Sequence, residues 1–174
     1  DLAFLVLGTV MVVGFISQLR PHCRPIGFWL ALVGASTLAV AGLAGRRIEP
    51  LVGGIIILAA VGMLLALHPA PTRLVRPFAA SRSRPDVALL ALAGAAGIPA
   101  VWKAVELLGD ARAAGPSCFL GKCARGDRLA ELAAALVALV LVAALGASQP
   151  PGWRLALWAA TGGAAVIGIA SVAL

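Results

Sequence analysis

The chain has 174 residues, of which 61% are hydrophobic and 12% charged, and its mean hydropathy is +1.03. Soluble domains are about half apolar and a quarter charged, so this composition argues against an ordinary soluble domain and favours a membrane protein. The formal net charge is +7, but the cations fall in short connections between apolar runs, which is usual for arginines beside membrane spans. They form no basic face, so we expect no nucleic-acid partner.

Six apolar segments, each bounded by charge, proline or glycine, follow one another along the chain. A helix of about 20 apolar residues crosses the roughly 30 Å hydrocarbon core of a bilayer. A transmembrane β-strand would need about half that length, and its side chains would alternate in polarity. The sequence therefore predicts an all-α integral membrane protein, a single polytopic domain over 1–174 with about six transmembrane helices and short loops. The predicted helices are 2–19, 26–45, 51–67, 87–108, 129–147 and 153–174.

Local signals support these boundaries. Arg46 and Arg47 end the second segment, and Pro50 is a residue tolerated in a first helical turn. Asp86 is expected to cap the fourth helix, and Pro99 is expected to kink that helix without ending it.

Small residues recur every four positions in three segments, a spacing that lets membrane helices approach closely. We expect these stripes to face other helices. They are Ala31, Ala35 and Ala39; Ala130, Ala134 and Ala138; and Ala160, Ala164 and Gly168.

The cations are almost equally divided between the two sides of the predicted bundle, so one uninterrupted basic run decides the expected orientation. The connection between the third and fourth segments holds a run of cations with no acid before Asp86, so it is predicted to be a basic cytoplasmic loop that contacts anionic lipid or a partner. The connection 110–128 then lies outside. An Ala-, Leu-, Val-, Gly- and Arg-rich composition without Tyr is typical of a high-GC bacterial genome, so the predicted location is the bacterial inner membrane. The basic loop consists of Arg73, Arg76, Arg82 and Arg84.

Two cysteines, Cys118 and Cys123, lie in the connection that is predicted to face outwards. Four residues separate them, so a local disulfide is sterically possible and would shape the loop. Two unpaired thiols, a redox-active pair and a metal site are the alternatives. The redox interpretation lacks the C-x-x-C spacing of common thiol-exchange sites, and the predicted topology places both histidines on the opposite side.

The charges that lie deepest in apolar sequence are Lys103, Glu106 and Glu131. Lys103 and Glu106 are three residues apart on one predicted helix and can pair. Glu131 enters the next helix at a similar depth on the same side, so a contact with Lys103 is also geometrically reasonable. The three residues either snorkel to the interface or form a polar cluster at the mouth of a solute path or in a subunit contact.

The sequence indicates no catalytic residues, no cofactor and no metal site, because it contains no nucleophile elbow, no P-loop and no H-E-x-x-H motif. The leading functional hypothesis is a non-catalytic accessory subunit that packs against lipid, other membrane proteins or further copies of itself. One alternative is a small-solute permease or channel with a polar mouth at Lys103, Glu106 and Glu131. The other is a membrane thiol-redox enzyme that uses Cys118 and Cys123.

Overall fold

The computed structural model describes residues 2–18, 25–67, 86–115, 124–148 and 152–173. Within these residues the chain forms six α-helices and no strand, which confirms the predicted all-helical class. The helices are α1 (Leu2–Gln18), α2 (Pro25–Gly45), α3 (Ile48–Leu67), α5 (Val87–Ala113), α6 (Ala124–Ala147) and α7 (Trp153–Ala173).

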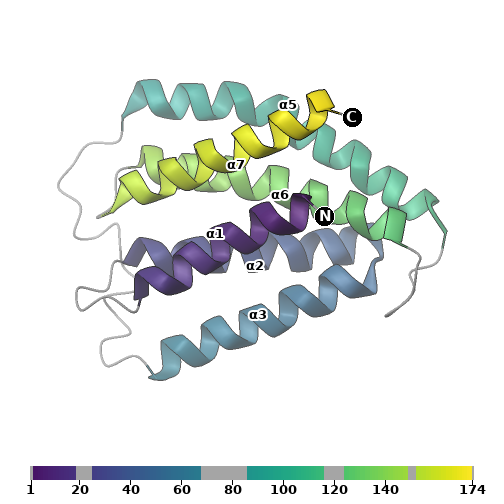
Figure 1. Cartoon of the computed structure of the whole chain (residues 1–174), viewed down its shortest axis with the longest axis horizontal. Coiled ribbons are helices and arrows are strands. Elements are labelled where there is room, and N and C mark those ends of the chain that lie inside the picture. Colours follow the sequence, from purple (N-terminus) through teal and green to yellow (C-terminus); the bar gives the residue numbers. More distant parts are fainter. Residues whose placement is uncertain (1, 19–24, 68–85, 116–123, 149–151, 174) are drawn as a thin grey trace.

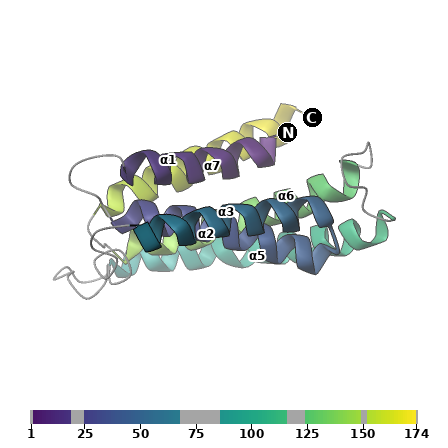
Figure 2. The same cartoon turned by 90° about the horizontal axis from the view of Figure 1, so that it is seen from below.

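The helices run roughly along the long axis of the molecule and form two layers (Figures 1 and 2). Four of them lie side by side in the order α3, α2, α6, α5, and each contacts its neighbour in that order. Helices α1 and α7 form the second layer and pack on α2 and α6. The central helices α2 and α6 are therefore covered, whereas α3 and α5 lie at the two edges of the first layer.

Four helices are long and apolar enough to cross a membrane, judged by length and composition. They are α2 over Ile26–Gly45, α3 over Ile48–Leu67, α5 over Val87–Ala113 and α6 over Arg125–Ala147. Helix α7 contributes a shorter apolar stretch, Trp153–Ile169.

The two edge helices expose large apolar side chains. Ile56 and Met63 on α3 are 62% and 65% exposed, and Ile98 and Val105 on α5 are 75% and 64% exposed. In water such surfaces would be a large apolar patch, whereas hydrocarbon covers them without cost.

Helix caps follow the sequence signals. The Asp86 carboxylate accepts hydrogen bonds from the backbone N–H groups of Ala88 (3.0 Å) and Leu89 (3.2 Å), so the predicted cap of α5 is present. The Asp86 N–H also donates to the Ala147 carbonyl at 3.2 Å, which joins the start of α5 to the end of α6. Pro50 lies in the first turn of α3, where its missing N–H costs no helical hydrogen bond.

Helix α2 ends in a Schellman motif, in which the residue after the helix adopts a left-handed conformation. The N–H groups of Arg46 and Arg47 donate back to the carbonyls of Leu43 (3.2 Å) and Gly42 (2.7 Å). Arg46 takes the left-handed position with φ = 57°. Glycine usually occupies this position, so an arginine here carries backbone strain.

Three helices extend beyond the predicted ranges at this end. Helix α3 begins at Ile48, before the predicted Leu51. Helix α5 continues past Leu108 to Ala113, and α6 begins at Ala124, before the predicted Leu129. Hydropathy marks only the apolar part of a helix, and the polar turns that carry Asp110 and Asp127 continue it. Helix α5 also bends along its length (Figure 1), as expected because Pro99 lies inside it.

The core lies between α1, α2 and α6 and consists largely of alanine and leucine. Ala35 and Ala134 are 0% and 1% exposed and pack with Leu7 and Leu38 in one cluster. The stripes on α2 and α6 do face other helices, since Ala31, Ala130 and Ala138 are also buried. The stripe on α7 does not, because Ala164 and Gly168 are exposed and only Ala160 is buried.

Helices α2 and α3 approach each other closely at Gly54. A Cβ atom added to Gly54 would lie 2.5 Å from the backbone nitrogen of Ala39 and 2.7 Å from its Cα. Only glycine allows this backbone contact.

Candidate functional site

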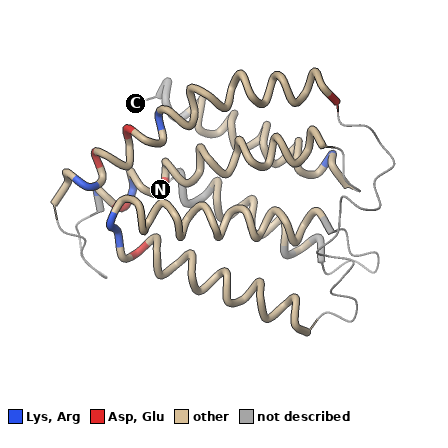
Figure 3. Tube along the Cα trace, turned by 180° about the vertical axis from the view of Figure 1, so that it is seen from behind, with Lys and Arg blue, Asp and Glu red and all other residues tan. Residues whose placement is uncertain are grey.

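Charged residues gather at one end of the molecule, where α2 and α5 end and α3 and α6 begin (Figure 3). At the opposite end the described residues include two charged side chains, Asp86 and Arg154. The guanidinium of Arg154 lies over the Trp153 ring, 5.6 Å from its centroid. The charged end carries Arg46, Arg47, Glu49, Lys103, Glu106, Asp110, Arg112, Arg125, Asp127, Arg128 and Glu131.

Arg47 is the largest fully buried side chain of the described chain and is only 2% exposed. It follows the Schellman turn of α2 and enters the space between the end of α5 and the start of α6. Its Nη2 donates to the Ala111 carbonyl in the last turn of α5. Its Nε and Nη1 have no hydrogen-bond partner.

Arg112 makes the reciprocal contact. Its Nε donates from the last turn of α5 to the Ala44 carbonyl at the end of α2. The last carbonyls of a helix lack partners within the helix and carry the negative end of its dipole, so an arginine is a favourable donor there. Arg47 thus caps the end of α5, and Arg112 caps the end of α2. Together they fix the position of α5 relative to α2 along the helix axes.

The start of α6 completes this arrangement, which we call the arginine lock (Arg47, Arg112, Gly126 and Asp127). Gly126 lies against the guanidinium of Arg47, and an added Cβ would overlap it. Asp127 is 4% exposed, its Oδ1 has no hydrogen-bond partner, and it interacts electrostatically with Arg47. An acid in the first turn of a helix is favourable, so the charges of the lock match the helix dipoles around them.

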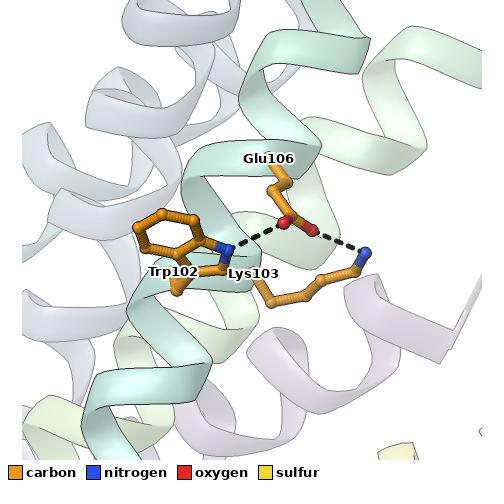
Figure 4. A network of polar contacts seen from close by, with 3 residues as sticks. All are labelled: Trp102, Lys103 and Glu106. Atoms are coloured by element: carbon orange, nitrogen blue, oxygen red, sulfur yellow. Dashed lines mark hydrogen bonds and ion pairs between the residues drawn. The ribbon is translucent and has the colours of Figure 1, made fainter.

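A separate polar group lies on the outer face of α5 (Figure 4). The Glu106 carboxylate accepts from Lys103 Nζ at 2.9 Å through one oxygen and from Trp102 Nε1 at 2.8 Å through the other. We call these three residues the α5 triad. They are exposed, with Trp102 at 71% and the Lys103 and Glu106 side chains at 60% and 48%.

The structure brings together two of the three residues of the predicted polar cluster. Lys103 pairs with Glu106, and its other electrostatic neighbour is Asp110. Glu131 is half-buried on α6 and interacts with Glu49, Asp127 and Arg128. Glu131 therefore lies beside the arginine lock, and its electrostatic neighbours include neither Lys103 nor Glu106.

Several predicted residues lie outside the described part of the chain. These are Cys118 and Cys123 of the possible disulfide, and Arg73, Arg76, Arg82 and Arg84 of the basic loop. Among the described residues, no group of three or more His, Cys, Asp or Glu is placed to hold a metal ion.

Sequence reasoning missed the burial of Arg47 and the role of Trp102. The spacing of four residues between Trp102 and Glu106 would have indicated their contact, because such residues are neighbours on a helix. The burial of Arg47 depends on how α5 and α6 pack on the α2–α3 turn. The sequence signal for it is Gly126, because the missing side chain leaves room for the Arg47 guanidinium.

An apolar groove of about 470 Å³ lies between α1 and α7. Val10 and Val13 of α1 line it, together with Trp158 and Gly162 of α7. Its surface resembles that of the exposed edge helices and offers no titratable group.

Comparison with protein-family models, curated proteins and solved structures found no match to this chain.

Proposed function

We propose that this chain is an integral membrane subunit that packs against other membrane proteins and performs no chemistry of its own. The observation that carries the proposal is the edge position of α5. This helix has 27 residues and contacts mainly α6, with a smaller contact to α2. Its outer surface combines exposed Ile98 and Val105 with the charged α5 triad.

Lipid alone is a poor cover for such a surface. Hydrocarbon suits Ile98 and Val105, but ionisable side chains within a membrane are costly and usually face protein or water. A second protein surface on α5 would cover both kinds of side chain. The α5 triad is therefore better explained by a protein neighbour than by lipid.

The other charges serve the bundle itself. Arg47 and Arg112 hold the ends of α2 and α5, and Asp127 lies at the start of α6. The core between α1, α2 and α6 is filled with Ala35, Leu38 and similar side chains. These contacts suit a rigid packing unit.

The permease alternative has less support. A polar mouth at Lys103, Glu106 and Glu131 would need these side chains on one path. The first two lie on the outer face of α5, whereas Glu131 lies beside the arginine lock. The thiol-redox alternative depends on Cys118 and Cys123, which lie outside the described residues.

For the location we propose the bacterial inner membrane, with the connection 110–128 outside and the basic loop in the cytoplasm. The cations at the charged end support this orientation, since Arg47 and Arg112 donate to carbonyls at helix ends and Lys103 pairs with Glu106 on the same helix. The arginines of the basic loop follow one another without an intervening acid, which is typical of the cytoplasmic side.

Purification of the tagged chain from its native membranes in mild detergent tests the proposal. After an alkaline carbonate wash the chain should remain in the membrane. After solubilisation it should elute in fixed stoichiometry with another membrane protein or with further copies of itself. A chain released by carbonate, or a chain that elutes as a monodisperse monomer, would contradict the proposal.

A further inference from the structure

The apolar groove between α1 and α7 follows one face of α7. Trp158, Gly162 and Val166 line it at intervals of four residues, so they share that face of the helix. Trp158 and Val166 are 77% and 41% exposed, whereas Val6 and Val10, which line the groove from α1, are buried. The groove is therefore open on its outer side and lies against well-packed side chains on its inner side.

Two adjacent glycines of α7 lie in this groove. A Cβ atom on Gly163 would lie 2.6 Å from Cδ2 of Leu139 and 3.1 Å from Cγ1 of Val6, so this glycine belongs to the packing of α7 on α6 and α1. A Cβ atom on Gly162 would meet no heavy atom within 4 Å. Gly162 thus leaves the groove open, and a larger side chain fits there without a clash.

A cation lies at one end of the groove. Arg154 precedes Trp158 by four residues and shares its face of α7. Arg154 also lines a second hollow of about 300 Å³ with Trp153 and Leu157, and Trp158 lines both hollows. Arg154 is exposed, and among the described residues no carboxylate forms an ion pair with it. Its positive charge is therefore available to a ligand that lies in the groove.

The groove has the length of one leaflet of a bilayer. On α7 it extends from Leu155 to Val166, eleven residues further on, or about 16 Å at 1.5 Å per residue. Half of the roughly 30 Å hydrocarbon core is about 15 Å. No charged residue interrupts α7 between these two positions, and Arg154 immediately precedes them. Arg154 thus lies where a lipid headgroup meets the hydrocarbon, and the groove covers the leaflet beneath it.

We propose that this groove binds an anionic phospholipid, with the phosphate beside Arg154 and an acyl chain between α1 and α7. This inference rests on the proposed membrane location. Any phospholipid has a chain for the groove, but a headgroup with net negative charge gains most from an unpaired cation. The first turn of α7 contains no acid, and the positive end of its dipole favours the same charge. In the proposed orientation Arg154 lies on the cytoplasmic side, where anionic lipids are abundant.

Quenching of Trp158 by brominated lipid tests this site, because the indole lines both hollows. The full chain with phenylalanine at Trp29, Trp102 and Trp153 would be reconstituted in phosphatidylcholine vesicles. These contain a small, varied fraction of phosphatidylglycerol or phosphatidylcholine with brominated chains. Half-maximal quenching should need about fivefold less phosphatidylglycerol than phosphatidylcholine, as expected for one arginine beside an anionic headgroup. An indole at Ile56→Trp on α3, in a chain that also lacks Trp158, should show no such preference.

Two substitutions with matched controls distinguish the headgroup contact from the chain contact. Arg154→Gln should abolish the preference for phosphatidylglycerol, whereas Arg125→Gln removes an exposed cation from the opposite end and should keep it. Gly162→Leu fills the groove and should weaken the preference at least about twofold, because the acyl chain loses apolar contact there. Gly62→Leu makes the same change at an exposed position of α3 where a Cβ also meets nothing within 4 Å, and it should have no effect.

The possible outcomes separate this inference from the membrane location on which it rests. Equal quenching of Trp158 by the two lipids, or a preference that survives Arg154→Gln or Gly162→Leu, would overturn the inference and leave the membrane location standing. Quenching of the Ile56→Trp indole but not of Trp158 would show that a protein surface, such as a second copy, covers the groove, and would also overturn it. Quenching of neither indole by lipid would contradict the membrane location itself.

Discussion

Arg47 and Arg112 exchange hydrogen bonds between the ends of two helices. Arg47 follows α2 and donates to the Ala111 carbonyl at the end of α5, while Arg112 at the end of α5 donates to the Ala44 carbonyl at the end of α2. Each arginine donates to a carbonyl in the last turn of a helix, at the negative end of the helix dipole. The pair sets the relative level of α2 and α5, and with it the depth of every residue on α5.

The buried member of this pair should matter most for stability. Arg47→Met keeps much of the side-chain volume but removes the donor to Ala111 and leaves Asp127 buried without the cation that faces it. Breaking one partner of a buried charged contact typically lowers the free energy of unfolding by about 3–5 kcal/mol. Denaturant unfolding in detergent micelles measures the loss.

The neighbouring arginine is the matched control for that change. Arg46 is exposed, so Arg46→Met should alter the free energy of unfolding by less than about 0.5 kcal/mol. Equal losses for Arg46→Met and Arg47→Met would mean that charge at the turn, and not the buried contact, is important.

The left-handed conformation of Arg46 gives a prediction of opposite sign. Arg46→Gly removes the Cβ that strains a residue at φ = 57°, so it should raise the free energy of unfolding by up to about 1 kcal/mol. Arg46→Ala removes the same charge but keeps the Cβ, and it should give no such gain. A lower melting temperature for Arg46→Gly than for Arg46→Ala would contradict the Schellman assignment.

Substitutions at two adjacent glycines on α3 distinguish the effect of close packing from that of helix propensity. A Cβ on Gly54 would meet the backbone of Ala39, whereas a Cβ on Gly53 would meet only the Leu38 side chain at 3.8 Å. Gly54→Ala should push α2 and α3 apart and lower the free energy of unfolding by about 1–3 kcal/mol. Gly53→Ala should raise it by about 0.5–1 kcal/mol, since alanine is the better helix former. If both variants shift the melting temperature in the same direction, the close approach at Gly54 is wrong.

The orientation can be tested by thiol labelling in right-side-out membrane vesicles. After mild reduction, a membrane-impermeant maleimide should label Cys118 and Cys123, which lie in the connection predicted to face outwards, and should spare Cys23. Detergent-solubilised protein, in which all three thiols meet the reagent, is the control. Labelling of Cys23 in sealed vesicles would reverse the topology.

Much of the fold could be predicted from the sequence because each helix contains a long apolar run that ends near a charged residue, a proline or a glycine. The cap at Asp86, the first-turn position of Pro50 and the pairing of Lys103 with Glu106 all follow from local spacing. Helix ends beyond the apolar runs could not be predicted in this way. The turns of α5 and α6 that carry Asp110 and Asp127 are polar, and hydropathy does not distinguish a polar helical turn from a loop.

The contacts between helices could not be predicted from the sequence for a different reason. Arg47 is one of two adjacent arginines at a helix end, and only the packing of α5 and α6 on the α2–α3 turn buries one and exposes the other. The place of Glu131 beside the arginine lock likewise depends on how α6 is rotated about its axis. Periodicity fixes which residues share a helix face, but in a chain this rich in alanine it does not fix which face is covered.

Fluorescence quenching of a single indole by brominated lipid tests the membrane assignment most directly. Ile56 lies near the middle of α3 and is 62% exposed. Ile56→Trp would be made in a chain in which Trp29, Trp102, Trp153 and Trp158 are replaced by phenylalanine, and the protein reconstituted in vesicles. We expect strong quenching by lipid brominated near the chain end, weaker quenching by lipid brominated near the headgroup, and little quenching by aqueous iodide. Quenching by iodide without quenching by either lipid would contradict it.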